Sequence, residues 1–131
     1  MGEENLLAVS RALQNVEICC GPFERILERV RAQDWVYFDP PYVPVSPTAN
    51  FTAYHVERFG IAEQTKLRDL CLQLSERNVL LMVSNSDTPL VRQLYGRWPF
   101  QIETVAARRA INCHSNKRGQ VNELLITNYG Q

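Results

Sequence analysis

The chain lacks several features that would place it in a familiar class. No apolar run approaches the roughly 20 residues that a membrane-spanning helix needs. Its N-terminus has no basic region followed by an apolar one, so we expect no secretory signal. The four cysteines include no C-x-x-C pair, which favours reduced thiols in a cytoplasmic protein over a disulfide scaffold. The two histidines are far apart in sequence, and no metal site is predicted.

The sequence has no glycine-rich motif of the kind found in nucleotide-binding proteins. The six glycines are spread along the chain, and no G-x-G occurs anywhere. A glycine-rich turn between a strand and a helix is the usual cradle for the phosphates of a nucleotide. We therefore expect no glycine-rich loop that could hold a nucleotide-like ligand.

Acidic residues are missing from one stretch, although the formal net charge of the chain is zero. Residues 104–122 contain no Asp or Glu, but they include the cations Arg108, Arg109, Lys117 and Arg118. Such a stretch is suited to contact phosphate groups. A solvated basic loop explains the same composition equally well, and both interpretations stay open at this point.

What is present fits one domain with a real core, because the chain has 131 residues and 45% of them are hydrophobic. Periodicity predicts helices over residues 4–14, 23–31, 62–76 and 87–95, and strands over 16–20, 35–38, 79–83, 100–105 and 121–127. Residues 43–59 form a long connection, which in a compact domain is usually functional or disordered. Strands alternate with helices before a closing pair of strands. This order is typical of an open, largely parallel α/β sheet.

One motif suggests chemistry. The apolar run Trp35-Val36-Tyr37-Phe38 ends in Asp39-Pro40-Pro41-Tyr42. Ligands of open parallel sheets bind outside the carboxyl ends of the strands, where this motif falls. Proline has a carbonyl but no amide hydrogen, and its ring fixes φ. The motif therefore presents rigid hydrogen-bond acceptors at the mouth of a buried strand.

These groups suit the methylation of an exocyclic amine such as that of adenine. The Asp39 carboxylate and the Pro40 carbonyl would accept hydrogen bonds from the amine and stabilise the positive charge that develops on its nitrogen. Tyr42 would stack on the base, which must be flipped out of a duplex to reach the site. Taken alone, the tetrapeptide is also compatible with a rigid turn in which Asp39 caps neighbouring groups.

The surrounding sequence narrows these alternatives. Residues 37–44 (YFDPPYVP) and 46–55 (SPTANFTAYH) resemble Dam-type DNA adenine N6-methyltransferases. Residues 84–87 (SNSD), 108–112 (RRAIN) and 117–125 (KRGQVNELL) resemble the same family in the same order. The resemblance covers almost the whole chain from about Asn5. It implies a partial Rossmann-like methyltransferase sheet, mostly parallel, with an antiparallel strand at the C-terminal end and flanking helices.

The resemblance also implies roles for individual residues. Asp39, Pro40 and Tyr42 match the family's catalytic positions, and Pro41 completes the motif. Phe23 and Asp39 are expected to contact the methyl donor, S-adenosylmethionine, and no metal is implied. Expected contacts to double-stranded DNA are Ser46, Thr48, Asn50, Arg108, Arg109, Lys117 and Arg118, although ordinary loop capping explains the first three equally well. The implied setting is the cytoplasm, nucleoid-associated when bound to DNA, with a role in DNA methylation or restriction–modification.

The chain departs from the family pattern in two respects. The family's donor-binding half begins with a strand followed by F-x-G-x-G, and a DNA-reading domain follows that half; both are missing here. Residues 1–131 thus resemble the C-terminal half of the catalytic domain, as one domain. In addition, Pro22 stands where many relatives have an acid that contacts the donor.

Three interpretations remain. The chain is the catalytic half of a DNA adenine methyltransferase, either truncated or working with a separate N-terminal half. Alternatively it is a non-catalytic remnant or DNA-binding module of that family, or, less in keeping with the DNA-like segments, a ribosomal RNA methyltransferase. In each case a half sheet has an exposed edge, so we expect self-association or a partner at that edge.

Overall fold

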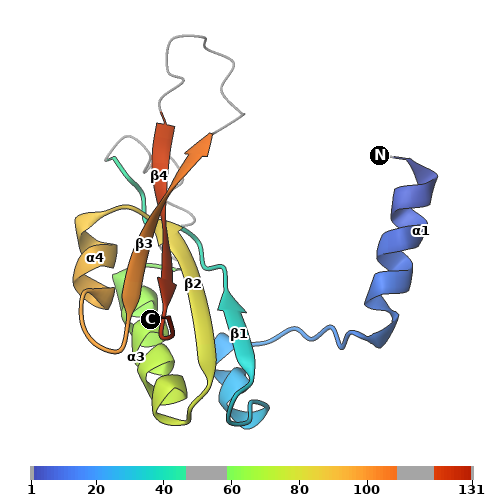
Figure 1. Ribbon diagram of the computed structural model, residues 1–131, viewed down its shortest axis with the longest axis horizontal. Helices are drawn as coiled ribbons and strands as arrows, with labels where there is room; N and C mark the ends of the chain where they lie inside the picture. The colour runs from blue at the N-terminus through green and yellow to red at the C-terminus, as the bar shows by residue number, and fades with distance from the viewer. Residues whose placement is uncertain (1, 47–58, 109–119, 131) are drawn as a thin grey trace.

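The fold is an open four-stranded sheet with helices packed on one face (Figure 1). The computed structural model describes residues 2–46, 59–108 and 120–130. The strands follow the order β1-β2-β4-β3, with β1 at Trp35–Phe38, β2 at Leu80–Ser86, β3 at Gln101–Arg108 and β4 at Gln120–Thr127. Among the described strands, β1 and β2 are the one pair of parallel neighbours, because β4 lies between β2 and β3 and runs antiparallel to both.

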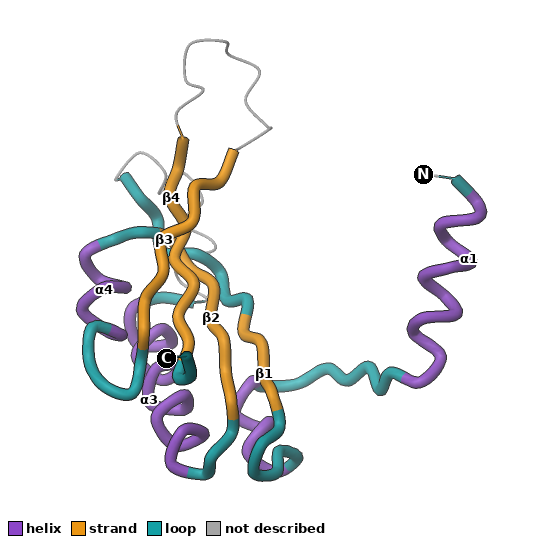
Figure 2. The backbone as a smooth tube through the Cα atoms, in the orientation of Figure 1, coloured by secondary structure: helices purple, strands orange, loops and turns teal. Residues whose placement is uncertain are grey.

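The helices are α1 (Glu3–Ala12), which continues into the 3-10 turn Leu13–Asn15, the 3-10 helix η2 (Phe23–Glu28), α3 (Ile61–Glu76) and α4 (Pro89–Tyr95). Figure 2 shows α3 and α4 side by side against the same face of the sheet. The core forms there, from buried Leu67, Leu70 and Leu74 of α3 and the inward-facing residues of β2 and β4. Among the described helices, none has the length and apolar composition needed to cross a membrane.

The α/β class, the flanking helices and the antiparallel C-terminal strand confirm the expectation from the sequence. The strand predicted at residues 16–20 was wrong, because the structure has no strand there. A strand is held by pairing with a neighbour, and all five of these residues are exposed with no partner in the sheet. The parallel part of the sheet is therefore a single pair of strands, smaller than expected.

The second face of the sheet carries no helix among the described residues. Side chains alternate along β1, so Val36 and Phe38 pack on the core while Trp35 and Tyr37 stay exposed at 54% and 48%. The two exposed rings stack, with centroids 6.2 Å apart and an angle of 5° between their planes. We call this surface, with Leu80 of β2 and Val105 of β3, the open face. Within the described residues β1 also forms an edge of the sheet, since β2 is the one strand that pairs with it there.

Helix α1 stands apart from the sheet (Figure 1), and none of its residues is buried. The exposed side chains include Leu6, Leu7 and Val9, each more than half accessible. Helices of this length are marginal in water on their own and are usually stabilised by packing of an apolar face. Both α1 and the open face thus present apolar surface that the described residues do not cover.

Candidate active site

The candidate site lies at the carboxyl ends of β1 and β2. Phe38 pairs with Val83, so Asp39 leaves the end of β1 beside Ser84 of β2. At this point β2 changes from apolar Leu81 and Val83 to polar residues that are at most 2% exposed, namely Ser84, Asn85 and Ser86. Buried polar groups cost free energy unless they are hydrogen-bonded. We therefore expect the side chains at this polar end of the strand to have specific hydrogen-bond partners.

A hydroxyl relay orients the Asp39 carboxylate. The Tyr37 hydroxyl donates to Ser84 Oγ at 2.9 Å, and the Ser84 hydroxyl donates to Asp39 Oδ1 at 3.1 Å. Because a hydroxyl has a single hydrogen, the bond from Tyr37 directs the Ser84 hydrogen toward Asp39. In the described part of the chain nothing donates to Asp39 Oδ2, and the side chain is exposed. The carboxylate is therefore fixed in direction and keeps one oxygen as an acceptor.

The two prolines present their carbonyl groups differently. The side-chain amide of Gln64 donates to the Pro41 carbonyl at 2.8 Å. No donor within residues 2–46, 59–108 and 120–130 reaches the Pro40 carbonyl, although Pro40 itself is buried. The carbonyl that remains available to a ligand is thus that of Pro40, next to the Asp39 carboxylate.

Tyr42 is half-buried, and its hydroxyl lies 3.4 Å from Glu123 Oε2, at the long end of hydrogen bonding. Burial raises the pKa of the Tyr42 phenol; a hydrogen bond with Ser84 opposes this, and the carboxylates of Glu123 and Asp39 add to it. The net effect raises the pKa of the phenol above its ordinary value of 10.0, so the Tyr42 hydroxyl is uncharged at neutral pH. The ring can therefore stack on a base as a neutral aromatic surface.

Phe23, the other expected donor contact, meets the motif across a cavity of about 280 Å³. Asp39, Pro40 and Pro41 line this cavity together with Phe23 and Phe59. The two rings pack at 6.0 Å between centroids, tilted by 57°. The fold thus brings Phe23 of η2 and Asp39 at the end of β1 to the same cavity.

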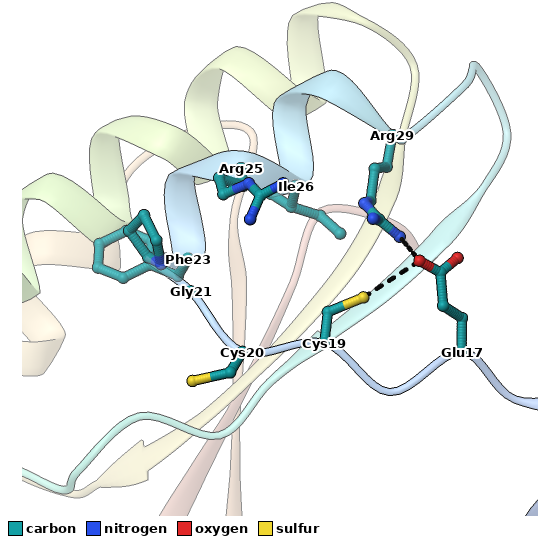
Figure 3. Close-up of a pocket in the computed structure, with 9 residues that line it drawn as sticks. Glu17, Cys19, Cys20, Gly21, Phe23, Arg25, Ile26 and Arg29 are labelled. Atoms are coloured by element: carbon teal, nitrogen blue, oxygen red, sulfur yellow. Dashed lines mark hydrogen bonds and ion pairs between the residues drawn. The ribbon is translucent and has the colours of Figure 1, made fainter.

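A second hollow, of about 340 Å³, follows the extended segment before η2 (Figure 3). Arg29 Nη1 and Glu17 Oε1 form an ion pair at 2.7 Å, and the Cys19 thiol donates to the same oxygen at 3.2 Å. The hydrogen bond from Arg29 is the main cause that lowers the pKa of Glu17. Phe23 lines this hollow as well, so it borders both cavities.

A family model identifies the family of the chain. The model for the D12 class N6 adenine-specific DNA methyltransferases matches residues 1–111. The chain belongs to this family.

Individual relatives agree with this adenine methyltransferase family. Over 130 residues, the chain is 39% identical to the type II methyltransferase M1.LlaDCHI of Lactococcus lactis subsp. cremoris, covering 98% of the chain and 45% of the relative. Over 129 residues, it is 43% identical to the type II methyltransferase M.MjaIII of Methanocaldococcus jannaschii, covering 97% and 44%. Identity to the DNA adenine methylase of Escherichia coli K12 is 37% over 123 residues, covering 94% and 44%. The chain thus spans somewhat less than half the length of the curated relatives it matches.

The DNA contacts expected from the sequence can be placed only in part. Ser46 is exposed and follows the motif loop. Arg108 ends β3, which runs in the same direction as β2 because both are antiparallel to β4. Arg108 therefore lies at the same end of the sheet as Asp39, the end at which β1, β2 and β3 finish. The remaining contacts lie outside the described residues: Thr48, Asn50, Arg109, Lys117 and Arg118.

Several neighbours of the motif were not predicted as site residues. Ser84 was predictable, because the carboxyl ends of parallel neighbours meet and residues 84–87 resemble the methyltransferase family. Tyr37 was hidden in an apolar run, and Glu123 belongs to a distant strand. Gln64 gave no signal, since a polar residue in a helix is ordinarily exposed. In the described ranges, no cluster of three His, Cys, Asp or Glu side chains could hold a metal ion.

Proposed function

We propose that the chain is the catalytic half of an S-adenosylmethionine-dependent DNA methyltransferase that methylates N6 of an adenine flipped out of double-stranded DNA. The observation that carries this proposal is the pair of acceptors at the end of β1, the Asp39 carboxylate and the Pro40 carbonyl, beside the half-buried ring of Tyr42. Family membership supports it. Residues 1–131 form one domain in this proposal.

The chain's own residues prepare the adenine amine. The lone pair of N6 is delocalised into the ring, so the amine is a weak nucleophile. Hydrogen bonds from its two hydrogens to Asp39 and Pro40 favour a pyramidal nitrogen with a localised lone pair, and they stabilise the charge that develops on it. Stacking on Tyr42 fixes the plane of the base. Ser84 keeps the Asp39 carboxylate in place, where it holds the hydrogen that N6 must lose.

S-adenosylmethionine would supply a methyl group on a positively charged sulfur, which keeps the electron pair of the broken bond as N6 bonds to the carbon. Phe23 and Asp39 would contact this donor, because the cavity between them offers an aromatic wall for a ring and a carboxylate for a polar group. The sequence has no G-x-G motif that could form the rest of the donor-binding site. We therefore expect the chain by itself to bind the donor weakly, which isothermal titration measures.

The partner of the chain is then either a separate N-terminal half or a second copy, seated on the edge of β1 and the open face. The relatives are more than twice as long as the segment that matches them, which favours a missing half. The double-stranded DNA would be contacted by Ser46, Thr48 and Asn50 and by the cations Arg108, Arg109, Lys117 and Arg118. A protein that methylates cellular DNA would be cytoplasmic and nucleoid-associated. The type II names of two relatives suggest a role in restriction–modification.

The test is methyl transfer to duplex DNA by the chain together with a supplied N-terminal half. We expect transfer in the wild type and a loss of at least roughly a hundredfold in Asp39→Ala, the size of effect seen for other preorganised electrostatic groups. Asp69→Ala, which removes an exposed carboxylate of α3, is the matched control and should retain activity. DNA binding without any transfer would instead support the non-catalytic remnant, which the missing glycine loop favours. Transfer to ribosomal RNA but not to duplex DNA would support the third interpretation.

A further inference from the structure

We propose that Gln64 and Asn85 are positioning residues for methyl transfer, because their buried side-chain amides fix the main chain on both sides of Tyr42. The two residues lie on different elements, Gln64 in α3 and Asn85 in β2, and they are 2% and 0% exposed. This inference rests on the proposed function, since it assigns a task within the same site. We call the two side chains the amide bridge.

The orientation of Asn85 follows from its backbone neighbours. The Val43 amide donates to Asn85 Oδ1 at 3.0 Å, and the Ser86 amide donates to the same atom at 2.8 Å. Two N–H donors require an oxygen at that position, which settles the direction of the side-chain amide. The nitrogen of Asn85 therefore points the other way and donates to Gln64 Oε1 at 3.1 Å.

The orientation of Gln64 follows in turn. With its oxygen occupied by Asn85, its nitrogen donates to the Pro41 carbonyl at 2.8 Å. The hydrogen bonds thus run in one direction, from the Val43 amide through Asn85 and Gln64 to the Pro41 carbonyl, and reversing either side chain would oppose two donors or two acceptors. The Ser86 hydroxyl also donates to the Val43 carbonyl.

The consequence for the site is twofold. Main-chain groups immediately before and after Tyr42 are hydrogen-bonded to a strand and a helix, so the backbone position from which the Tyr42 ring projects is held by rigid elements. The bridge also occupies the Pro41 carbonyl, which leaves the Pro40 carbonyl as the acceptor beside Asp39. Gln64 and Asn85 touch neither base nor donor in this arrangement, so they act through Tyr42 and the prolines.

A crossed amide-exchange experiment on the isolated chain tests the bridge without any need for activity. Asn128 is a matched control at the other end of β2: its Oδ1 accepts from the Leu81 amide at 2.8 Å and its nitrogen donates to the Val79 carbonyl at 2.8 Å. In Asn85→Ala we expect the protection of the Val43 amide to fall about tenfold more than that of Leu81, and in Asn128→Ala the reverse. Equal losses at both amides in both variants would reduce Asn85 to general stability and overturn the proposal.

A second variant uses pH to restore the bridge. In Gln64→Glu we expect burial to raise the pKa of the introduced carboxyl group. Protonated, that group can donate to the Pro41 carbonyl while accepting from Asn85; ionised, it places an oxygen against the carbonyl. The protection factor of Val43 should therefore be near the wild-type value at low pH and fall as the pH rises through the raised pKa. Wild type and Gln64→Leu should show no such step, and a flat profile in Gln64→Glu would contradict the bridge.

Methyl transfer with a supplied N-terminal half then tests the positioning role. At neutral pH we expect Gln64→Glu to lower kcat roughly tenfold to a hundredfold with little change in KM for the donor, because misplacement of catalytic groups costs this much. Asn128→Ala should leave kcat unchanged. Wild-type kcat in Gln64→Glu would overturn the positioning role. If the wild type shows no transfer at all, the proposed function fails, while the exchange experiments still decide whether the bridge holds the loop.

Discussion

At the scale of single residues, the core separates into an apolar part and a polar end. Leu81, Val83, Leu124 and Ile126 are fully buried, and each loses little by packing only on apolar neighbours. Buried Asn85 is different, because its amide needs partners on every side and finds them in two other segments. Because Asn85 is satisfied only when these partners are in place, it favours one conformation of the loop that contains Val43.

Thiol reactivity offers a prediction at this scale. Cys71 is 0% exposed, and burial raises the pKa of its thiol to about 12, whereas Cys19 and Cys20 are exposed. Because the thiolate is the reacting form, iodoacetamide at pH 8 should label the peptide containing Cys19 and Cys20 and leave the Cys71 peptide unlabelled until denaturant is added. Peptide mapping by mass spectrometry measures both. Rapid labelling of Cys71 in the native chain would contradict the packing of α3 described above.

At the scale of elements, short α4 depends on the residues before it. Thr88 caps the helix, since its hydroxyl accepts from the Val91 amide at 3.3 Å, and Pro89 occupies the first turn. Asp87 binds Arg92 through both carboxylate oxygens, at 2.6 and 2.9 Å. The Asp87 carboxylate, just before the N-terminus of α4, also suits the helix dipole.

The Asp87–Arg92 pair predicts a pH-dependent stability. The hydrogen bond from Arg92 is the main cause that lowers the pKa of Asp87 below its ordinary value of 3.8. A lowered folded-state pKa stabilises the protein above the unfolded value, and this stabilisation is lost as the pH falls through the folded value. Wild type should therefore be more stable than Asp87→Asn at neutral pH, with the difference vanishing in acid. Urea unfolding at several pH values measures it.

A double variant separates the ion pair from other effects of Asp87. The loss of stability caused by Arg92→Gln, relative to wild type, should also be present at neutral pH and vanish in acid. The double variant Asp87→Asn/Arg92→Gln should be little less stable than either single variant. Additive losses, or a difference between wild type and Asp87→Asn that persists in strong acid, would mean that the pair does not carry the effect.

At the scale of the whole molecule, the chain presents one covered face and one open face. Trp35 and Tyr37 hold each other in a stack, and the Trp35 indole donates to the Tyr129 hydroxyl at 2.9 Å, so the open face is ordered although it is exposed. An ordered aromatic surface next to an unpaired strand edge is a surface prepared for contact. A chain that covers less than half of its relatives would be expected to expose such a surface.

We therefore expect the isolated chain to self-associate. Trp35→Lys should shift it toward the monomer by placing a charge on the edge strand of the open face, in the way natural edge strands are protected. Ile18→Lys, at a position 78% exposed but outside the sheet, is the control and should not. Sedimentation velocity over a range of concentrations measures the distribution. A wild type that stays monomeric throughout would refute the prediction.

The sequence by itself determined the local elements and the centre of the site. Periodicity placed β1, α3, β2, α4 and the closing strands close to their observed bounds, because the side-chain pattern of each element is local. The motif from Asp39 to Tyr42 was recognisable for the same reason, since it is contiguous and two of its residues are prolines with fixed geometry.

The tertiary structure decided everything that needs a distant partner. Residues 16–20 have the composition of a strand, but no strand in the described part of the chain pairs with them, so the pattern alone did not make them a strand. The insertion of β4 between β2 and β3 left a single parallel pair. The arrival of Gln64 at the Pro41 carbonyl, from 23 residues along the chain, exists only in the folded molecule. Strand pairing and buried hydrogen bonds are contacts between separated segments, and their partners are present only once the chain has closed around them.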